Sequence, residues 1–445
     1  MKIQKKSISL IIASMSGLIL YIWGSTYDYI WPNLVGIYVM ALSIILLVWS
    51  RTNYLLFILF AIISYCNYSI VFAEYLSIIK GTVFTKYAGT GVANEAIYIL
   101  LLFMSILTGI LTFIKVPEKK ALSALEIADT RYPEKITAPI VLCLDAVLAY
   151  IMIFSFGRPE QLGDRGTPTA VYEYSILLFI LCLFYGKKNK LCRSLTMTLL
   201  IMFAMQNFLF GGRITGLQLI IVAYLMVYES RLSIKKALPF AIIGFFLLSI
   251  IGEARGAVLL GNFSAKAIYE SLKNKKFTLD TVYSAYHTSM TFLMSEKNVG
   301  WDTRLSIMGG FLKTIIFGKY DSVESSVARY TAQYYYHCGG GILPFFFEFY
   351  LGRAGVALIA GYIAYLIKII GRLNIASSGL TKCIGIYIVS SVFRWYIYSP
   401  IQITRGILLL IICYLLIEFV SRTVYRKRGG GINNQLMYDG KRGRD

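Results

Sequence analysis

Residues 34–50 read LVGIYVMALSIILLVWS, and after only Arg51 and Thr52 residues 53–73 read NYLLFILFAIISYCNYSIVFA. Neither run contains a charged residue, and both are apolar on all sides instead of at every second position, which argues against half-buried strands. A run of about 18 apolar residues can cross the hydrocarbon core of a bilayer, about 30 Å thick, as an α-helix. Two such runs joined by two residues therefore predict a transmembrane hairpin.

Comparable apolar runs recur along the whole chain. Its 445 residues are 57% hydrophobic and only 15% charged, whereas soluble domains carry about 25% charged residues. Lipid leaves no water to satisfy the backbone, so a spanning segment must be a helix or part of a closed barrel, and uniformly apolar runs favour helices. We predict an all-α, polytopic integral membrane protein with about 12 transmembrane helices. The predicted spans are residues 7–23, 34–50, 53–73, 97–115, 137–156, 172–186, 194–210, 214–230, 237–252, 345–367, 381–399 and 404–420.

The charges of the loops predict the orientation. More than half of the 44 Lys and Arg residues lie in segments that face the cytoplasm when both termini are cytoplasmic, as the positive-inside rule requires. The net charge of +21 is then an anchor at the inner leaflet and not a footprint of nucleic-acid binding. The chain divides into nine spans in 1–252, a long periplasmic loop in 253–344, three spans in 345–420 and a basic cytoplasmic tail in 421–445.

The long outer loop contains patterns typical of short helices. We expect helices over 280–295, 302–316 and 327–336 from their capping residues and periodicity. The middle one is amphipathic, which predicts a helix lying on the outer leaflet or on the helical bundle. The seven cysteines form neither a disulfide framework nor a group with zinc-binding spacing, and only Cys338 is expected to be exposed on the outer side.

Five arginines lie close to the predicted outer membrane surface. Charges at this depth are costly, so such residues usually face a polar cavity or an anionic partner, although a single arginine can also extend to lipid headgroups. Arginine stays charged and forms bidentate bonds with phosphate. The group therefore predicts an outward-facing pocket for a membrane-borne ligand with a pyrophosphate. The five residues are Arg213, Arg255, Arg353, Arg394 and Arg405.

A tyrosine- and glycine-rich stretch, YYYHCGGG over 334–341, precedes the tenth span. Its glycines leave backbone N–H groups open to an anion, or form a hinge where the chain re-enters the membrane. Near arginines, His337 is expected to be a neutral imidazole that can act as a general base, with a purely structural role as the alternative. Glu348 is placed to orient an arginine or His337. We expect His287 to pack in the core, and Asp145 has no predicted partner.

Four stretches, 208–216 (FLFGGRITG), 253–256 (EARG), 337–341 (HCGGG) and 352–355 (GRAG), together resemble the O-antigen polymerase (Wzy-type) family. The layout is also similar to that family, with about twelve spans, a basic inner face and a long periplasmic loop before the last three helices. The resemblance in layout covers nearly the whole chain. The role of each individual arginine stays open.

The resemblance implies a GT-C-like membrane glycosyltransferase in the bacterial inner membrane, with its active site facing the periplasm. Such an enzyme moves a growing glycan from its undecaprenyl-pyrophosphate carrier onto a sugar hydroxyl of an incoming lipid-linked repeat unit. His337 would be the base, with Glu348 supporting it, and the arginines would hold the pyrophosphates. No metal or other cofactor is expected, and binding of a polysaccharide chain-length regulator stays open.

Other functions also fit the pattern. An O-antigen ligase would share the fold and the donor but transfer the glycan to lipid A core. A flippase or transporter for lipid-linked glycans predicts ionisable residues through the depth of the bundle and internal repeats, whereas the ionisable residues here cluster at the outer face. A structural subunit of an envelope assembly would not need the outer arginines.

Overall fold

The fold is mostly helical and has the character of a polytopic membrane protein. Among the described residues, eight helices are long and apolar enough to cross a membrane, and three further apolar helices are shorter. The ninth predicted span, 237–252, lies outside the described part of the chain. The computed structural model describes residues 5–76, 87, 89–114, 132–157, 166–210, 212–227, 266, 269, 273, 280–318, 323, 326–373 and 377–427.

The helices follow the predicted spans closely in the first half of the chain. The eight long segments are α1 (Lys5–Thr26), α2 (Pro32–Ser50), α3 (Tyr54–Ile70) continued by the π-helix η1 (Val71–Tyr75), α4 (Gly91–Leu111), α5 (Glu134–Phe154), α7 (Lys190–Leu209), α15 (Arg353–Gly371) and α18 (Ile401–Lys427). The shorter apolar helices are α6 (Ala170–Tyr185), α8 (Arg213–Val227) and α16 (Gly379–Ser390). Two short strands, β1 (Phe156–Gly157) and β2 (Thr167–Pro168), pair antiparallel between α5 and α6.

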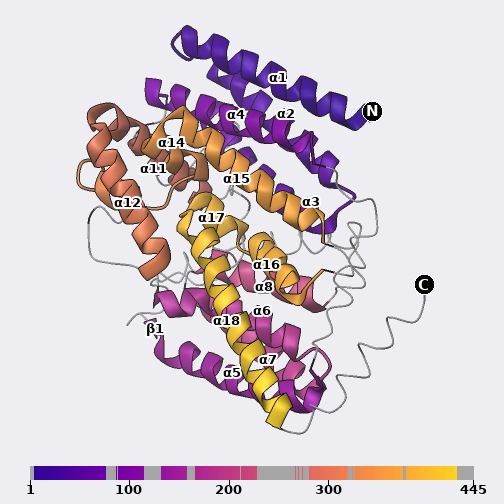
Figure 1. Cartoon of the computed structure of the whole chain (residues 1–445). Helices are drawn as coiled ribbons and strands as arrows, with labels where there is room; N and C mark the ends of the chain where they lie inside the picture. The colour runs from indigo at the N-terminus through magenta and orange to yellow at the C-terminus, as the bar shows by residue number, and fades with distance from the viewer. Residues whose placement is uncertain are drawn as a thin grey trace.

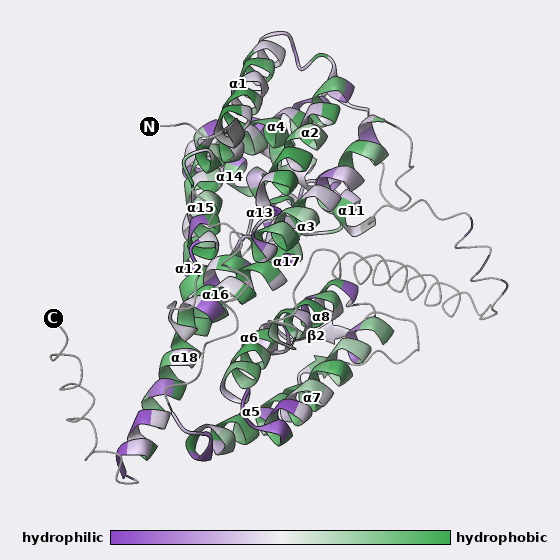
Figure 2. Ribbon diagram, turned by 90° about the vertical axis from the view of Figure 1, so that its right-hand side faces the viewer, coloured by the Kyte–Doolittle hydropathy of each residue, from purple (hydrophilic) through white to green (hydrophobic). Residues whose placement is uncertain are grey.

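The helices pack in two groups (Figure 1). In the first group α1 and α2 pack on α4, α2 also packs on α3, and α15 packs on α4. The second group contains α5, α6, α7 and α8, while α16 and α18 contact α6. Figure 2 shows hydrophobic colouring along most of the helical surface and hydrophilic residues at the C-terminal end of α18, which matches helices with a lipid-facing belt.

The structure divides two of the predicted spans, so both predictions are wrong as single helices. The span 345–367 becomes α14 (Leu343–Leu351) and α15, because Gly352 between them has φ +61° and ψ −152°, a conformation almost restricted to glycine. Similarly, 381–399 becomes α16 and α17 (Val392–Ile397), separated at Ser391. Both breaks place charged residues at helix ends instead of inside a span.

The long outer loop contributes to the helical core. α11 (Asp280–Asn298) packs against α3, α4 and α14, and α13 (Val327–Thr331) is shorter than predicted. α12 (Trp301–Phe317) packs on α14 and α18 through one face, as expected for a helix on the bundle. Its other face leaves apolar side chains exposed, namely Trp301, Leu305, Leu312, Ile316 and Phe317.

The exposed Cys338 provides a test of the orientation. Of the seven cysteines, Cys143 is also exposed, but it lies on α5 where lipid would cover it, and Cys413 lies on α18. We expect a membrane-impermeant maleimide added to intact spheroplasts to label the wild-type protein and not the Cys338→Ala variant. Labelling that requires permeabilised membranes would reverse the predicted orientation.

Candidate functional site

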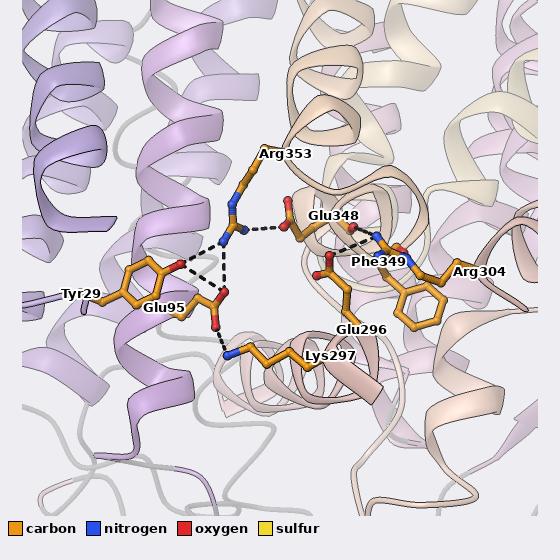
Figure 3. Close-up of polar contacts among 8 residues, drawn as sticks. All are labelled: Tyr29, Glu95, Glu296, Lys297, Arg304, Glu348, Phe349 and Arg353. Carbon is orange, nitrogen blue, oxygen red and sulfur yellow. Dashed lines mark hydrogen bonds and ion pairs between the residues drawn. The ribbon is translucent and has the colours of Figure 1, made fainter. Parts of the chain in front are cut away.

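Two groups of polar side chains lie at helix ends that the sequence places at the outer membrane face. The first, here called the Arg353 network, joins the α1–α2 turn to α4, α11, α12, α14 and α15 (Figure 3). The second, here called the Arg405 cluster, joins α6, α8, α17 and α18. The network contains Tyr29, Glu95, Glu296, Lys297, Arg304, Glu348 and Arg353, and the cluster contains Glu173, Tyr174, Thr215, Arg394, Tyr398 and Arg405.

Arg353 is the centre of the network. It is the first residue of α15, and its Nη2 donates to Glu95 Oε1 at 3.0 Å and to the Tyr29 hydroxyl at 3.2 Å. Its Nη1 donates to Glu348 Oε1. Lys297 Nζ lies 2.7 Å from the other oxygen of Glu95. One guanidinium therefore ties the start of α15 to α4, to α14 and to the α1–α2 turn.

Arg304 performs a similar task at the C-terminal end of α14. Its Nε donates to the carbonyl of Phe349 at 2.5 Å and its Nη2 to the carbonyl of Glu348 at 3.1 Å. The first bond gives a partner to a carbonyl at the end of the helix, and the second adds a donor to a carbonyl that already accepts the N–H of Gly352 at 2.7 Å. The Nη2 of Arg304 also lies 3.1 Å from Glu296 Oε1. Burial raises the pKa of Glu296, and the positive charge of Arg304 acts in the opposite direction.

The charges of the Arg353 network cancel. Three basic side chains, Arg304, Arg353 and Lys297, face three carboxylates. The guanidinium of Arg353, which the sequence suggested for pyrophosphate binding, is already shared between Glu95 and Glu348. The network is therefore suited to holding helices together, because each of its basic groups is already in contact with a carboxylate.

Arg394 and Arg405 meet in the second group. Arg394 Nη1 donates to Glu173 Oε1 at 2.9 Å and its Nη2 donates to the Thr215 hydroxyl, while its Cζ lies 5.4 Å from the ring centroid of Tyr398. The Cζ of Arg405 lies 5.5 Å from the ring centroid of Tyr174. Glu173 and Tyr174 are consecutive on α6, so the two guanidinium groups are held by neighbouring residues.

Arg405 is only partly satisfied. Its Nη1 donates to the Thr314 carbonyl of α12 at 3.3 Å, and its buried Nε has no hydrogen-bond partner among the residues that the structure describes. No carboxylate in the described part of the chain forms an ion pair with it. Gly318 lets α12 end against this guanidinium, because its φ is +93° and a Cβ there would come within 2.8 Å of both terminal nitrogens. Arg405 therefore keeps a positive charge and free donors.

Among the residues that the structure describes, no partner is assigned to the two remaining predicted arginines, Arg213 and Arg255. Arg213 begins α8 and is half-buried, and within the described residues its guanidinium makes no hydrogen bond or ion pair. Thr215, two residues later, contacts Arg394, but residues two apart point to different sides of a helix, so this contact does not direct Arg213 toward the cluster. Arg255 lies outside the described residues.

His337 is bound within its own turn. Its Nε2 lies 3.1 Å from the Thr331 hydroxyl, and its Nδ1 accepts the N–H of Gly339 at 3.0 Å. This bonding pattern assigns the proton to Nε2 of a neutral ring. Burial lowers the pKa of His337, against a smaller opposing effect of the Ala328 backbone. In this arrangement the only lone pair that could accept a proton is already used, which favours the structural role over the catalytic one.

The glycines after His337 form a turn and not an open anion site. Gly339, Gly340 and Gly341 have φ values of +80°, +78° and +158°, and the N–H groups of the first and third already donate to His337 and to the Ile397 carbonyl. Gly340 packs closely on Tyr398, whose ring lies under Arg394. The hinge interpretation is thus favoured, and the turn lies next to the Arg405 cluster.

The buried ionisable residues away from these groups have local partners. His287 is fully buried, as expected for a core residue, and its Nε2 lies 3.4 Å from Glu74 Oε2. Glu74 also accepts the Tyr283 hydroxyl at 2.8 Å. Asp145, for which the sequence suggested no partner, is bonded by the Thr196 hydroxyl at 2.9 Å.

Several of the residues in these groups were not expected from the sequence. Glu95 and Glu173 were overlooked because they stand at the edges of predicted spans, at 97–115 and 172–186. Arg304 lies on a helix that was treated as part of a loop. A carboxylate within the first turns of an apolar run is the signal that could have found Glu95 and Glu173, since its cost in lipid requires a partner.

The Arg353 network predicts unequal effects for two of its cations. Arg353→Met leaves the buried Glu348 without its partner and should destabilise the protein by about 2 kcal/mol, less than for a fully buried pair because Arg353 is partly exposed. Lys297→Met should have little effect because Lys297 is 59% exposed. Melting curves of the purified protein measure both. Adding Glu348→Gln to Arg353→Met should recover part of the loss, and no recovery would contradict the role of the pair.

The hydrogen bonds and burial of His337 predict how the stability of the protein depends on pH. Because the folded pKa lies below the ordinary value of 6.5, the contribution of the neutral ring to stability is complete above about pH 6.5. It decreases as the pH falls toward the lowered pKa, since an opened turn takes up the proton more readily. The chain has two histidines, so NMR of histidine-labelled protein, assigned with His287→Asn, can follow His337. A midpoint at or above 6.5 would contradict the buried, bonded ring.

Comparisons with protein-family models, with curated proteins and with solved structures found no match to this chain. The resemblance to O-antigen polymerases therefore stays a prediction from short motifs and from the layout of the helices. What the chain does has to be inferred from the charge and geometry of the two groups of polar residues.

Proposed function

We propose that this chain is a membrane glycosyltransferase of the O-antigen polymerase type, with about twelve spans in a GT-C-like arrangement. It would join undecaprenyl-pyrophosphate-linked repeat units into a surface polysaccharide at the periplasmic face of the inner membrane. The observation that carries the proposal is the Arg405 cluster. It places two arginines at helix ends on the predicted outer face, and among the described residues one carboxylate, Glu173, is bonded to one of them.

The position of the cluster favours an anion attached to a lipid. Arg405 lies in the first turns of α18, a span candidate, and Arg394 lies on the short α17 just before it. A soluble anion would have to reach helix ends at headgroup depth, whereas a lipid-borne pyrophosphate arrives there with its carrier. Guanidinium groups suit this ligand because they stay charged and donate two parallel hydrogen bonds to phosphate oxygens.

The same charges fit the chemistry of glycan transfer. When the bond between the sugar and the pyrophosphate breaks, negative charge develops on the departing phosphate, and prearranged positive groups stabilise it most effectively away from bulk water. Arg405 and Arg394 are the groups that we assign to this task. Arg353 and Glu348 are assigned to the scaffold that holds α14 and α15, and His337 to the turn beside Tyr398.

An O-antigen ligase would use the same donor and the same cluster, so it is the nearest alternative. A flippase fits less well, because the ion pairs of Arg304, Arg353 and Arg394 lie near helix ends that the sequence places at the outer face. Asp145 in α5, which is bonded to Thr196, has no such pair within the described part of the chain. The polymer made in cells distinguishes the three functions.

The test uses a strain that lacks this gene, complemented with wild-type protein or with variants that insert normally. We expect a ladder of surface polysaccharide with wild type, single repeats with Arg405→Ala, and a shortened ladder with Arg405→Lys, which keeps the charge but loses the bidentate geometry. Arg422→Ala, on the same helix and exposed, is the matched control and should give a normal ladder.

Other outcomes would change the assignment. Full-length polymer stranded on its lipid carrier in the deletion strain would establish the ligase, and repeat units trapped on the cytoplasmic side would establish the flippase. A normal ladder with Arg405→Ala would remove the Arg405 cluster from the site.

A further inference from the structure

We propose that Glu173 is the general base that accepts the proton of the attacking sugar hydroxyl. This inference rests on the proposed function and names a residue of the same site. Glu173 is on the first turn of α6, and its Oε1 accepts Arg394 Nη1 at 2.9 Å. Its side chain is 25% exposed, whereas Glu95 and Glu348 of the Arg353 network are buried, so Glu173 can meet a ligand.

Its surroundings suit the role. Tyr174, the next residue on α6, lies under the guanidinium of Arg405. Its hydroxyl interacts electrostatically with Arg405, Glu173 and Arg394. Within the described residues, Glu173 is the carboxylate that forms an ion pair in this cluster. The hydroxyl that attacks the sugar must lie beside the carbon bonded to the pyrophosphate, so its base must stand next to the arginines that hold that pyrophosphate.

Geometry argues against the two catalytic residues expected from the sequence, the base His337 and its supporting residue Glu348. The backbone of Glu348 bonds Arg304 and the Thr314 carbonyl bonds Arg405. Arg304 and Thr314 are ten residues apart on α12, which corresponds to about 15 Å along the helix axis. A hydrogen-bonded proton transfer needs about 3 Å. His337 is closer to the cluster through Gly340 and Tyr398, but its acceptor nitrogen already binds the Gly339 N–H.

The transfer forms one bond, breaks one bond and moves one proton. The hydroxyl oxygen of the acceptor forms a bond to the anomeric carbon of the donor, and its proton passes to the Glu173 carboxylate. The bond from that carbon to the pyrophosphate breaks, and the electron pair leaves with the lipid pyrophosphate, beside Arg405 and Arg394. The proton is later released to water. The bound pyrophosphate places negative charge beside the Arg394 guanidinium that Glu173 contacts, which favours transfer of the proton to the carboxylate.

The experiment uses purified full-length protein in nanodiscs, with lipid-linked repeat units extracted from the deletion strain as substrate. Glu173→Gln keeps an oxygen that can accept from Arg394, so the link between α6 and α17 is preserved while the base is removed. We expect kcat to fall at least about 100-fold, with KM changed less than about threefold. Native mass spectrometry should show that Glu173→Gln still binds undecaprenyl pyrophosphate and that Arg405→Ala does not.

Two further measurements distinguish a general base from a residue that only links two helices. The wild-type rate should fall at acid pH as Glu173 is protonated beside Arg394, Arg405, Tyr174 and Tyr398, and the residual rate of Glu173→Gln should lack this acid limb. Glu418→Gln is the matched control and should leave kcat and KM unchanged. Glu418 is on α18 and accepts the hydroxyl of Tyr185 at the far end of α6, at 2.7 Å, so it too links α6 to a neighbouring helix.

The outcomes distinguish this inference from the function on which it rests. An active wild-type protein together with Glu173→Gln that keeps more than a third of kcat, or that loses activity only through KM or melting temperature, overturns the role of Glu173 alone. A wild-type protein that transfers no glycan overturns the proposed function and this role with it.

Discussion

The ion pairs that Arg353 forms with Glu95 and Glu348 compensate charges close to lipid, and the packing of α4, α14 and α15 depends on this compensation. A charge close to lipid is costly unless a partner of opposite sign is in direct contact. Arg353 lies at the start of α15, Glu95 near the start of α4 and Glu348 near the end of α14, so bringing these charges together also sets where α4 and α15 begin and where α14 ends. Arg304 then completes the end of α14 through two backbone carbonyls. Helix placement and charge compensation are one arrangement here.

The Arg405 cluster differs from this network in its balance of charge. In the network each guanidinium has a carboxylate, and the sum is zero. In the cluster Glu173 pairs with Arg394, while Arg405 has a carbonyl at 3.3 Å and an unbonded Nε. A buried polar atom without a partner can mark a place where an ion or water binds. Because Glu348 Oε2 of the network is also unbonded among the described residues, the contrast lies in the carboxylate partner that Arg405 lacks there. The difference separates arginines that hold the fold from arginines that can hold a substrate.

α12 connects the two groups and shows why the long loop cannot be treated as an appendage. Its first turns place Arg304 in the network, and its last turn offers the Thr314 carbonyl and the glycine at 318 to Arg405. Its amphipathic pattern predicted a helix on the outer leaflet or on the bundle, and its packing on α14 and α18 shows a helix on the bundle. The pattern could not show that the helix contacts one charged group at each end, because that depends on which residues of other helices lie there.

The sequence by itself indicated a lipid environment, the helical class and most of the spans, because long uncharged runs such as 34–50 can cross a bilayer only as helices. It also pointed to arginines and to the neighbourhood of His337 at one membrane face. Only the tertiary structure decided which charges meet. The break at Gly352 depends on a backbone conformation that the residue type merely permits, and the partners of Arg353, Arg394 and Arg405 come from helices distant in the chain. The pairing of charges across a bundle is decided by packing, and no local pattern of residues encodes it.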